Sequence, residues 1–313
     1  MEESNFINRR SFIQMGGLGA LGIWSKPWLT QVKKEFTLHI LHTNDWHSRI
    51  DPFPESDPKF PSQGGASRRA SLIKAIRAKA DEVLLLDAGD IIQGTPYFNY
   101  YGGEPEIKLM NAMKYDAATL GNHDFDNGME ALATLIKQAD FPFVNCNYGL
   151  EGTPLQHLIK KSIVLKKKGA RIGITGVGIN LKGYIPDSHH TGIQYLDPIE
   201  NANKEAQRLK TEEKCALVIC LSHLGYSYTD QKISDIRLAE QSENIDIIIG
   251  GHTHTFLERP EKVSNRKGKN VVINQVGWAG LRLGQIECVF SSQNNTKNEA
   301  EARIKLFKKS IAI

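Results

Sequence analysis

The stretch Leu38-His39-Ile40-Leu41-His42-Thr43-Asn44-Asp45-Trp46-His47 joins a short apolar run to a polar end that carries an acid and an imidazole. A mostly apolar run of this length is typical of a buried strand in a layered α/β protein. Asp45 and His47 are two positions apart, so an extended backbone would project both side chains to the same side. The stretch therefore predicts a buried strand that presents ligand-type side chains at its carboxyl end.

Four further apolar runs, at 83–86, 117–120, 217–221 and 245–249, are followed in the same way by acidic, amide or imidazole side chains. The residues that follow them are Asp87-Ala88-Gly89-Asp90, Gly121-Asn122-His123-Asp124-Phe125-Asp126, Ser222-His223 and Gly250-Gly251-His252-Thr253-His254. In open α/β sheets, ligands bind beyond the carboxyl ends of the strands. We therefore expect the five clusters to converge on one crevice, where the glycines leave room for close approach.

The rest of the chain alternates similar apolar runs with amphipathic segments. Strands are also predicted at 143–145, 172–177 and 271–275, and helices at 65–80, 105–113, 129–139 and 199–213. Near the end, segments 283–290 and 303–312 flank a polar turn around Asn294 and Asn295, a pattern that predicts an antiparallel hairpin. Together these elements predict an α/β fold that forms one domain over residues 36–313.

Length and composition exclude several classes of protein. The 313 residues are 40% hydrophobic and 24% charged, which is typical of a globular chain and not of a disordered or fibrous one. The net charge of +4 is too small for a nucleic-acid binder, so no nucleic-acid partner is expected. No apolar run approaches the roughly 18 residues of a membrane span, so no stable membrane span is expected.

The first 35 residues differ in character from the rest. Asn8-Arg9-Arg10-Ser11-Phe12 precedes the short, glycine-rich and weakly apolar segment 15–24. The paired arginines resemble a twin-arginine export signal, and the apolar segment has the length of a signal-peptide core. An amphipathic N-terminal helix is the alternative, but repeated glycines disfavour a helix. We predict that residues 1–35 are an export signal and that the protein is periplasmic.

The polar clusters contain the ligand types of a metal site. Carboxylate, amide and imidazole groups without a thiolate favour Zn, Mn or Fe. The candidate ligands are Asp45, His47, Asp90, Asn122, His223, His252 and His254. Seven ligands exceed what one catalytic ion with an open position takes, but they suit two ions that share a bridging carboxylate. We predict two divalent metal ions as the cofactor.

The order of the motifs resembles the calcineurin-like metallophosphoesterases. These motifs are Asp-x-His, Gly-Asp-x-x-Gln-Gly, Gly-Asn-His-Asp, Ser-His and Gly-His-x-His, and they extend over about residues 36–290. The amino-acid sequences of segments 41–47, 89–96 and 121–126 are similar to those of the 5′-nucleotidase branch of that family. The resemblance implies a four-layer αββα sandwich and a metal-dependent phosphoric ester hydrolase. It also implies a small phosphate ester, such as a nucleotide, as the substrate.

The resemblance assigns roles to single residues. It implies one ion held by Asp45, His47, Asp90 and His254, and a second held by Asp90, Asn122, His223 and His252. Asp90 would bridge the two ions, and a hydroxide held between them would attack phosphorus. His123 would be the catalytic histidine beside the phosphate, and Asp126 would be its partner.

One departure from the family leaves the substrate open. Family nucleotidases carry a C-terminal domain that binds the nucleoside, and this sequence stops at Ile313, where that domain would begin. The first alternative is therefore a catalytic subunit that is inactive alone and pairs with a separately encoded nucleoside-binding domain. The others are a UDP-sugar hydrolase, a cyclic-nucleotide hydrolase and a thiosulfohydrolase relative.

Two groups of aromatic residues in the sequence have no assigned catalytic role. The aromatic side chains of Tyr97, Phe98, Tyr100 and Tyr101 come soon after Asp90. A patch near the substrate is one interpretation, but we expect them to pack in the core. Trp278 precedes the last predicted hairpin and belongs either to the core or to a surface for a partner.

Overall fold

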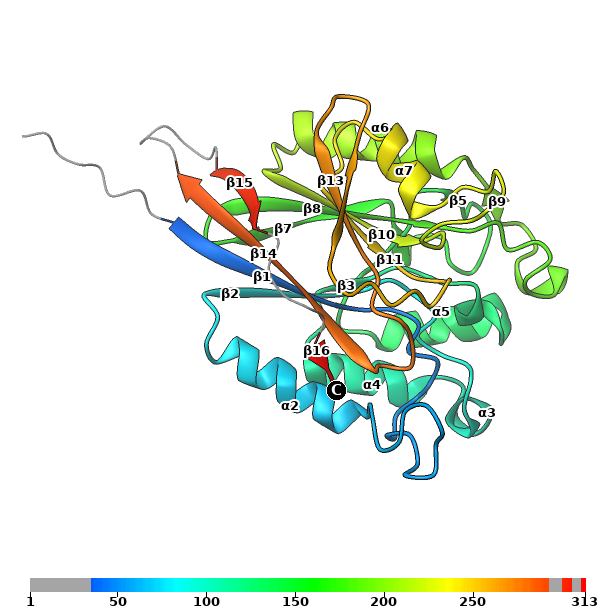
Figure 1. The fold of residues 1–313 in the computed structure, drawn as a ribbon. Helices are drawn as coiled ribbons and strands as arrows, with labels where there is room; N and C mark the ends of the chain where they lie inside the picture. Colours follow the sequence, from blue (N-terminus) through cyan, green and yellow to red (C-terminus); the bar gives the residue numbers. More distant parts are fainter. Residues whose placement is uncertain (1–34, 293–299, 306–310) are drawn as a thin grey trace, which may run out of the picture. The chain divides into compact units, whose positions relative to one another are not determined.

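Two β-sheets form the centre of the domain. The computed structural model describes residues 35–292, 300–305 and 311–313 (Figure 1). In the first sheet the strand order is β15-β14-β1-β2-β3-β4-β6, and β16 pairs with β14. The bounds of these strands are β1 (Glu35–Thr43), β2 (Glu82–Asp87), β3 (Ala117–Ala118), β4 (Phe143–Val144), β6 (Ile159–Lys160), β14 (Arg282–Ser292), β15 (Ala300–Lys305) and β16 (Ile311–Ala312). Strands β1 to β4 are parallel, whereas β14 runs antiparallel to β1.

The second sheet has six strands in the order β12-β13-β11-β10-β8-β7. Their bounds are β7 (Ser162–Lys167), β8 (Ala170–Gly178), β10 (Leu217–His223), β11 (Ile247–Gly250), β12 (Glu261–Ser264) and β13 (Asn270–Asn274). The four central strands are parallel, and β7 and β12 are antiparallel edges. A separate small ladder joins β5 (Tyr148–Gly149) to β9 (Gln194–Tyr195).

Helices cover the outer face of each sheet (Figure 1). Beside the first sheet lie α2 (Ala66–Arg77), α3 (Pro96–Tyr101), α4 (Glu104–Met113) and α5 (Gly128–Gln138). The second sheet is covered by α6 (Pro198–Thr211) and α7 (Asp235–Gln241). Two short 3₁₀ turns, η1 (His123–Phe125) and η2 (Asp187–His189), follow β3 and β8. Each predicted helix is present to within a few residues.

Alternation along the strands produces three apolar layers. Leu84 packs between the two sheets, while its neighbour Leu85 packs against the helices of the first sheet. In the second sheet, Ile219 faces the inter-sheet layer and Val218 faces α6 and α7. Successive side chains of a strand point to opposite faces, so each central strand contributes to two layers. The result is the four-layer αββα sandwich that the resemblance implies.

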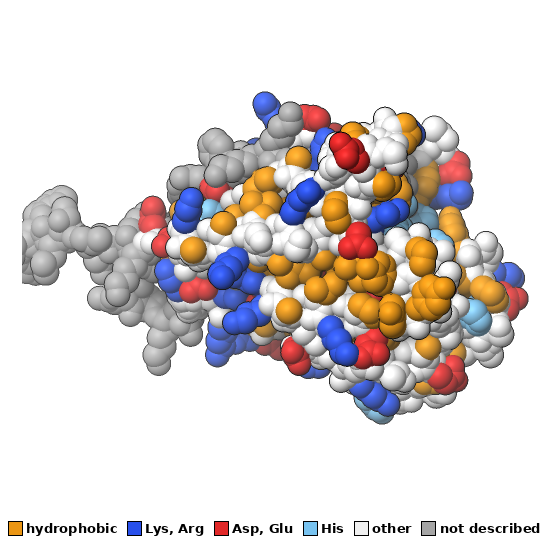
Figure 2. All heavy atoms as spheres, turned by 90° about the horizontal axis from the view of Figure 1, so that it is seen from below, with side chains coloured by type: hydrophobic (Ala, Val, Ile, Leu, Met, Phe, Trp, Pro, Cys, Tyr) orange, Lys and Arg blue, Asp and Glu red, His pale blue; other side chains and the backbone are white. Residues whose placement is uncertain are grey.

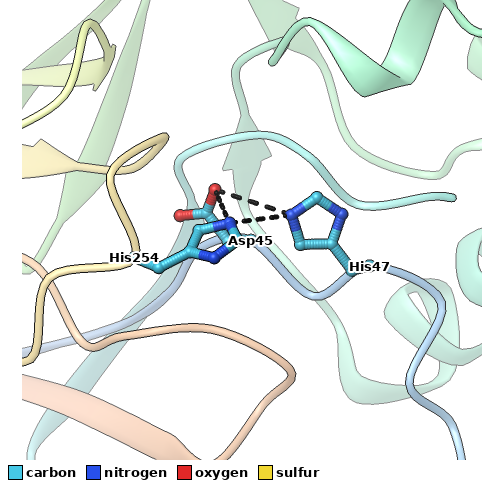
Figure 3. A group of neighbouring side chains, drawn as sticks. All are labelled: Asp45, His47 and His254. Atoms are coloured by element: carbon cyan, nitrogen blue, oxygen red, sulfur yellow. Dashed lines mark hydrogen bonds and ion pairs between the residues drawn. The ribbon is translucent and has the colours of Figure 1, made fainter. Parts of the chain in front are cut away.

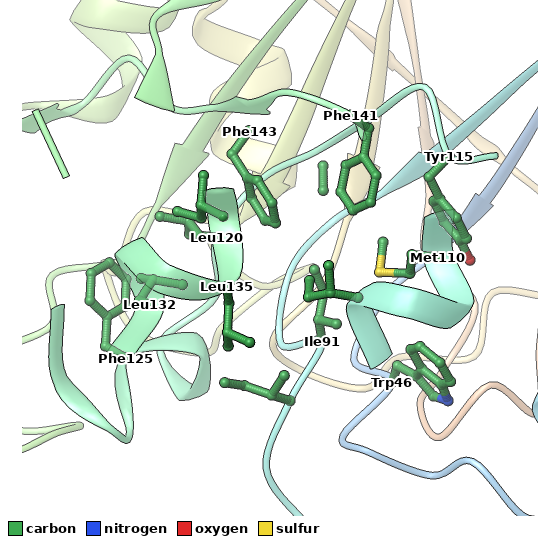
Figure 4. Packing of buried hydrophobic residues seen from close by; sticks show 14 of the residues in the cluster. Trp46, Ile91, Met110, Tyr115, Leu120, Phe125, Leu132, Leu135, Phe141 and Phe143 are labelled. Carbon is green, nitrogen blue, oxygen red and sulfur yellow. The ribbon is translucent and has the colours of Figure 1, made fainter. Parts of the chain in front are cut away.

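The layer between the first sheet and its helices is rich in aromatic residues (Figure 4). Phe125, Phe141 and Phe143 pack there with Met110 of α4 and Leu132 of α5. All five side chains are at most 4% exposed. This packing anchors the segment around η1, which begins at the histidine of the Gly-Asn-His-Asp motif.

The predicted C-terminal hairpin is wrong in its second strand. The partner of β14 is β15, which ends at Lys305, whereas the sequence pattern predicts a strand over 303–312. Ile311 and Ala312 form the separate strand β16, which pairs with Arg282 and Leu283 in a register shifted by two residues. The eleven-residue β14 is long enough to pair with both segments. The predicted turn at Asn294 and Asn295 lies outside the described residues.

The expectation that all four aromatics of α3 pack in the core is also wrong. Phe98 is buried, but Tyr100 is 81% exposed and Tyr101 is 58% exposed. The helix has six residues and only Phe98 is buried in it, so it has one short packing face. The Tyr97 hydroxyl donates a hydrogen bond to Asp51 Oδ2 at 2.8 Å.

The surface and the N-terminal segment add two observations. Figure 2 shows Lys and Arg side chains interspersed with Asp and Glu on one face, together with several hydrophobic side chains. Among the described helices, none is both long and apolar enough to cross a membrane. The predicted export signal lies outside the described residues except for Glu35, and it stays a prediction that N-terminal sequencing of the mature protein would test.

Candidate metal centre

The five polar clusters lie at the carboxyl ends of strands from both sheets. β1, β2 and β3 belong to the first sheet, and β10 and β11 belong to the second. The His223 Nδ1–H donates to the Ala88 carbonyl at 2.7 Å, and the His252 backbone N–H donates to Asp45 Oδ1 at 3.0 Å. These contacts join the two sheets at their carboxyl edges. The expected convergence is therefore present, and it is built by two facing sheets.

The first group of side chains consists of Asp45, His47 and His254 (Figure 3). Asp45 Oδ1 lies 3.3 Å from His254 Nε2 and 3.9 Å from His47 Nε2. The two Nε2 atoms are 3.0 Å apart. Three donor atoms that converge in this way match the arrangement of protein ligands around one metal ion.

The second group consists of Asp90, His223 and His252, whose donor atoms all lie within 4.8 Å of one another. His223 Nε2 is 3.1 Å from Asp90 Oδ2, and both side chains are buried. The same Asp90 oxygen is 3.7 Å from His47 Nε2 of the first group. Asp90 therefore lies between the two groups.

Asn122 supplies a further oxygen at this edge. Its side chain is 3% exposed, and its Oδ1 atom has no hydrogen-bond partner within the described part of the chain. The backbone N–H of the next residue, His123, donates to Asp90 Oδ1 at 2.8 Å. Because a buried carbonyl oxygen without a partner is costly, this atom fits a role as a metal ligand. The donor set of carboxylates, imidazoles and one amide thus fits divalent ions.

Left-handed backbone conformations distinguish the candidate ligands. The φ angles are 50° at Asp45, 52° at His47, 54° at Asp90, 73° at His252 and 52° at His254. Residues with side chains rarely adopt these angles, which cost free energy and cluster at functional sites. The expectation of an extended backbone at Asp45 and His47 is therefore wrong, although both side chains enter the same group. His252 and His254 also have left-handed backbone angles, and their side chains enter different groups.

Hydrogen bonds to the far nitrogen fix the orientation of two imidazoles. His47 Nδ1 donates to the Gln93 carbonyl at 3.1 Å, and His223 Nδ1 donates to the Ala88 carbonyl. In each ring the Nε2 atom then faces the candidate site. Outer hydrogen bonds of this kind are common around metal-ligating histidines.

Burial and neighbouring charges control the ionisation of the groups. Burial lowers the pKa of His252 to about 4 and also lowers the pKa of His47, so both rings are neutral and suited to ligation. Burial disfavours charge on Asp90 and His223 as well, but their mutual attraction outweighs it. The pKa of Asp90 is therefore lowered, and that of His223 is raised. A divalent ion would take the place of the shared positive charge.

His123 and Asp126 form a pair at the exposed edge of the groups. His123 Nδ1 lies 2.8 Å from Asp126 Oδ2, and the His123 side chain is 34% exposed. The hydrogen bond to Asp126 is the main cause that raises the pKa of His123. The ring also stands edge-on to His47, with centroids 5.4 Å apart. The sequence-predicted pair is thus brought together beside the first group.

Asp124 is a structural residue that the sequence reasoning missed. Its buried carboxylate accepts hydrogen bonds from the backbone N–H groups of Asp90 at 3.0 Å, Ile91 at 2.9 Å and Gly121 at 2.8 Å. It therefore ties the loop after β2 to the loop after β3. The position within Gly-Asn-His-Asp is the only signal for it, because nothing local reveals the two donors that come from the loop after β2.

Asn44 and Gln275 are two further residues that the sequence reasoning missed. Asn44 Nδ2 donates to Asp45 Oδ2 and to the Gly277 carbonyl, each at 2.6 Å. Gln275 Nε2 donates to the Gly251 carbonyl, next to His252. Both amides thus brace a loop that carries candidate ligands, and only the tertiary structure brings them to it.

Two glycines show how closely the loops approach. A Cβ atom at Gly121 would overlap Asp90 Oδ1, and one at Gly251 would lie 2.9 Å from His223 Nδ1. Trp278 closes another side of the site, because its ring stacks on the His254 ring. The ring centroids are 5.5 Å apart and the angle between the ring planes is 4°. Trp278 also contacts Phe53, so it packs against the site and a small aromatic cluster together.

The fold and the paired groups define a metallophosphoesterase-type sandwich. The family model of the calcineurin-like phosphoesterases matches residues 38–256. The chain therefore belongs to the calcineurin-like phosphoesterase family, whose members are metal-dependent phosphoester hydrolases.

Comparisons with single proteins point to the 5′-nucleotidase branch. The chain is 34% identical to snake venom 5′-nucleotidase from Crotalus adamanteus over 87% of this chain and 48% of that protein. It is 34% identical to human 5′-nucleotidase over 82% of this chain and 47% of that protein. The 5′-nucleotidase precursor of Thermus thermophilus superposes with a TM-score of 0.73 at 31% identity, over 88% of this chain and 55% of that one. The chain spans about half the length of these relatives.

We expect replacement of Asp124 to destabilise the protein, because its carboxylate joins the loop after β2 to the loop after β3. Asp124→Ala leaves three buried N–H donors without an acceptor, which should lower the free energy of unfolding by about 3 kcal/mol. Urea denaturation measures this loss. The exposed Asp140→Ala variant is the control and should change stability by less than about 0.5 kcal/mol. Equal stability of the two variants would contradict the bracing role.

Proposed function

We propose that the protein is an exported dinuclear-metal phosphoesterase that hydrolyses nucleotides or related phosphate esters. The position of Asp90 carries this proposal, because one carboxylate lies between two converging groups of ligand atoms. A shared carboxylate is what two closely spaced ions require. The paired arginines at 9 and 10 support the export part.

One ion would be held by the first group together with Asp90, and the other by the second group together with Asn122. Asp45, His47 and His254 would complete one site, while Asn122, His223 and His252 would complete the other. When bound, such ions supply Lewis-acid stabilisation of phosphoryl charge and lower the pKa of water towards neutrality. Asn122 contributes a neutral oxygen, which limits the negative charge of the site and suits an anionic substrate.

His123 would act on the substrate directly. Asp126 accepts the Nδ1–H bond, so the Nε2–H of the imidazolium is free to donate to a phosphoryl oxygen or to the leaving oxygen. The raised pKa of His123 favours the protonated form that this role needs. Asp126 would orient the ring and stabilise its charge.

The substrate class rests on the relatives. The relatives named above are 5′-nucleotidases, and the sequence of this chain is similar to theirs. We therefore propose a nucleotide, and the UDP-sugar and cyclic-nucleotide alternatives are compared with it in the assays below.

Metal content tests the two-ion arrangement. We expect wild-type protein to retain two ions per chain after dialysis against Zn, Mn or Fe, as measured by elemental analysis. His254→Ala and His252→Ala should each lose one ion, because each removes a ligand from one group. Asp90→Ala should lose both, since it removes the shared ligand. A single ion in the wild type, or two in Asp90→Ala, would contradict the proposal.

Replacement of His123 separates catalysis from metal binding. His123→Ala should keep both ions but lower kcat by about 10²–10⁴-fold, because it removes a proton donor at the reacting group. The control is His157→Ala, which replaces an exposed histidine that belongs to neither group. An unaltered rate in His123→Ala rules out the assigned role.

A panel of esters tests the reaction class. The Mn-loaded chain should release phosphate from AMP and should cleave nucleotide esters such as AMP and UDP-glucose faster than bis-p-nitrophenyl phosphate, and its rate on a cyclic nucleotide is compared with theirs. Metal-free protein is the control and should be inactive. If the loaded chain is inactive on every ester, the proposal of a self-sufficient enzyme is wrong. Activity that appears only with a separately encoded nucleoside-binding domain would have the same meaning.

A further inference from the structure

A pocket of about 330 Å³ opens beside the second ligand group. It is formed by two loops that leave the carboxyl ends of β8 and β10, the same edge of the sheet that carries His223. The side chains that matter for its chemistry are Asn180, Lys182, Tyr184, Tyr195, Tyr228 and Lys232. Its volume lies within the range of small-molecule sites. We call it the Tyr184 pocket.

The Tyr184 pocket is in contact with the candidate metal centre. The Tyr184 ring stands edge-on to the His252 ring, with centroids 5.3 Å apart. Leu224 lines the pocket and directly follows His223 in the chain. A molecule in the pocket would therefore lie close to His252 of the second ligand group.

The lining presents aromatic surface to the opening. Tyr184 is 48% exposed and Tyr195 is 36% exposed, although both rings belong to the pocket. The Tyr228 hydroxyl donates to the Leu224 carbonyl at 2.7 Å, which fixes that ring. Flat, accessible tyrosine rings of this kind stack on planar ligands.

The lining also presents positive charge. Lys182 is exposed and pairs with no carboxylate among the described residues, so its ammonium is available to a ligand. Lys232 lies over the Tyr228 ring at 5.6 Å and is only weakly paired with Asp230 at 3.5 Å in an exposed ion pair. Aromatic rings and two lysines together favour a ligand that combines a planar ring with a negative charge.

We propose that the Tyr184 pocket binds the leaving group of the substrate, and that this leaving group is a nucleoside phosphate. The inference rests on the proposed phosphoesterase function and names its preferred substrate class, the nucleoside diphosphates and their esters. In the hydrolysis of ADP, a water oxygen bonds to the terminal phosphorus and the bond to the bridging oxygen breaks. AMP leaves with that oxygen and its electron pair, and the water protons pass to solvent or product.

The preference follows from what each leaving group offers to the pocket. AMP presents both a base for Tyr184 and a phosphate for Lys182. Adenosine, the leaving group of AMP hydrolysis, presents only the base, and glycerol presents neither. We therefore expect kcat/KM to fall in the order ADP, AMP, glycerol 3-phosphate.

Binding of AMP and adenosine to the metal-free chain tests the pocket without catalysis. Calorimetry should show that Lys182→Met weakens AMP about tenfold but adenosine less than twofold. Tyr184→Ala should weaken both, whereas Tyr184→Phe and Lys182→Arg should restore binding. The matched controls are Tyr100→Ala and Lys74→Met, which replace exposed residues outside the pocket and should bind as the wild type does. Metal content and thermal melting confirm that each variant is folded.

The outcomes separate this inference from the proposed function. Equal AMP affinity in Lys182→Met and wild type, or no adenosine binding at all, overturns the pocket assignment even if esters are hydrolysed. A metal-loaded chain that hydrolyses no ester, yet binds AMP through Lys182 and Tyr184, overturns the phosphoesterase and leaves the pocket standing. In active protein, Lys182→Met should lower the ratio of kcat/KM for ADP to that for p-nitrophenyl phosphate about tenfold. An unchanged ratio contradicts the leaving-group role.

Discussion

The buried charge of Asp90 is the constraint on which the site depends. A carboxylate in a low-dielectric interior is costly unless it is paired and hydrogen-bonded. Asp90 meets this requirement through the His123 backbone N–H, the His223 ring and the His47 ring. One of these imidazoles comes from the second sheet, so neither sheet alone can stabilise the carboxylate.

The relative position of the two sheets is therefore part of the chemistry. Apolar packing between them is not directional, and polar contacts supply the direction. His42 of β1 bonds to Asn274 of β13 at 2.8 Å, and burial keeps His42 neutral by lowering its pKa to about 3. Asn44 reaches across to Gly277 close by. These contacts hold the loop of Asp45 in register with the loops that bring His223 and His252.

Sequence patterns located most elements and missed those with weak patterns. Fully apolar runs such as 217–221 mark strands buried on both faces, and β10 is buried throughout. β7 was not predicted because it is an edge strand with mostly half-buried residues, and its lysines interrupt the apolar pattern. The prediction of the hairpin's second strand was wrong because β14 pairs with two segments, β15 and β16. Which segments pair is a long-range property of the fold.

The sequence by itself determined the ligand types, their order along the chain and their place after buried strands, since apolar runs and turn residues are local. Only the tertiary structure decided how the ligands are grouped. His252 and His254 are near neighbours in sequence and both have left-handed backbone angles, yet their side chains join Asp90 and Asp45 respectively. The strain of those angles is held by packing and hydrogen bonds from distant loops, including those of Asp124. No local pattern encodes such contacts, because their partners lie far apart in the sequence.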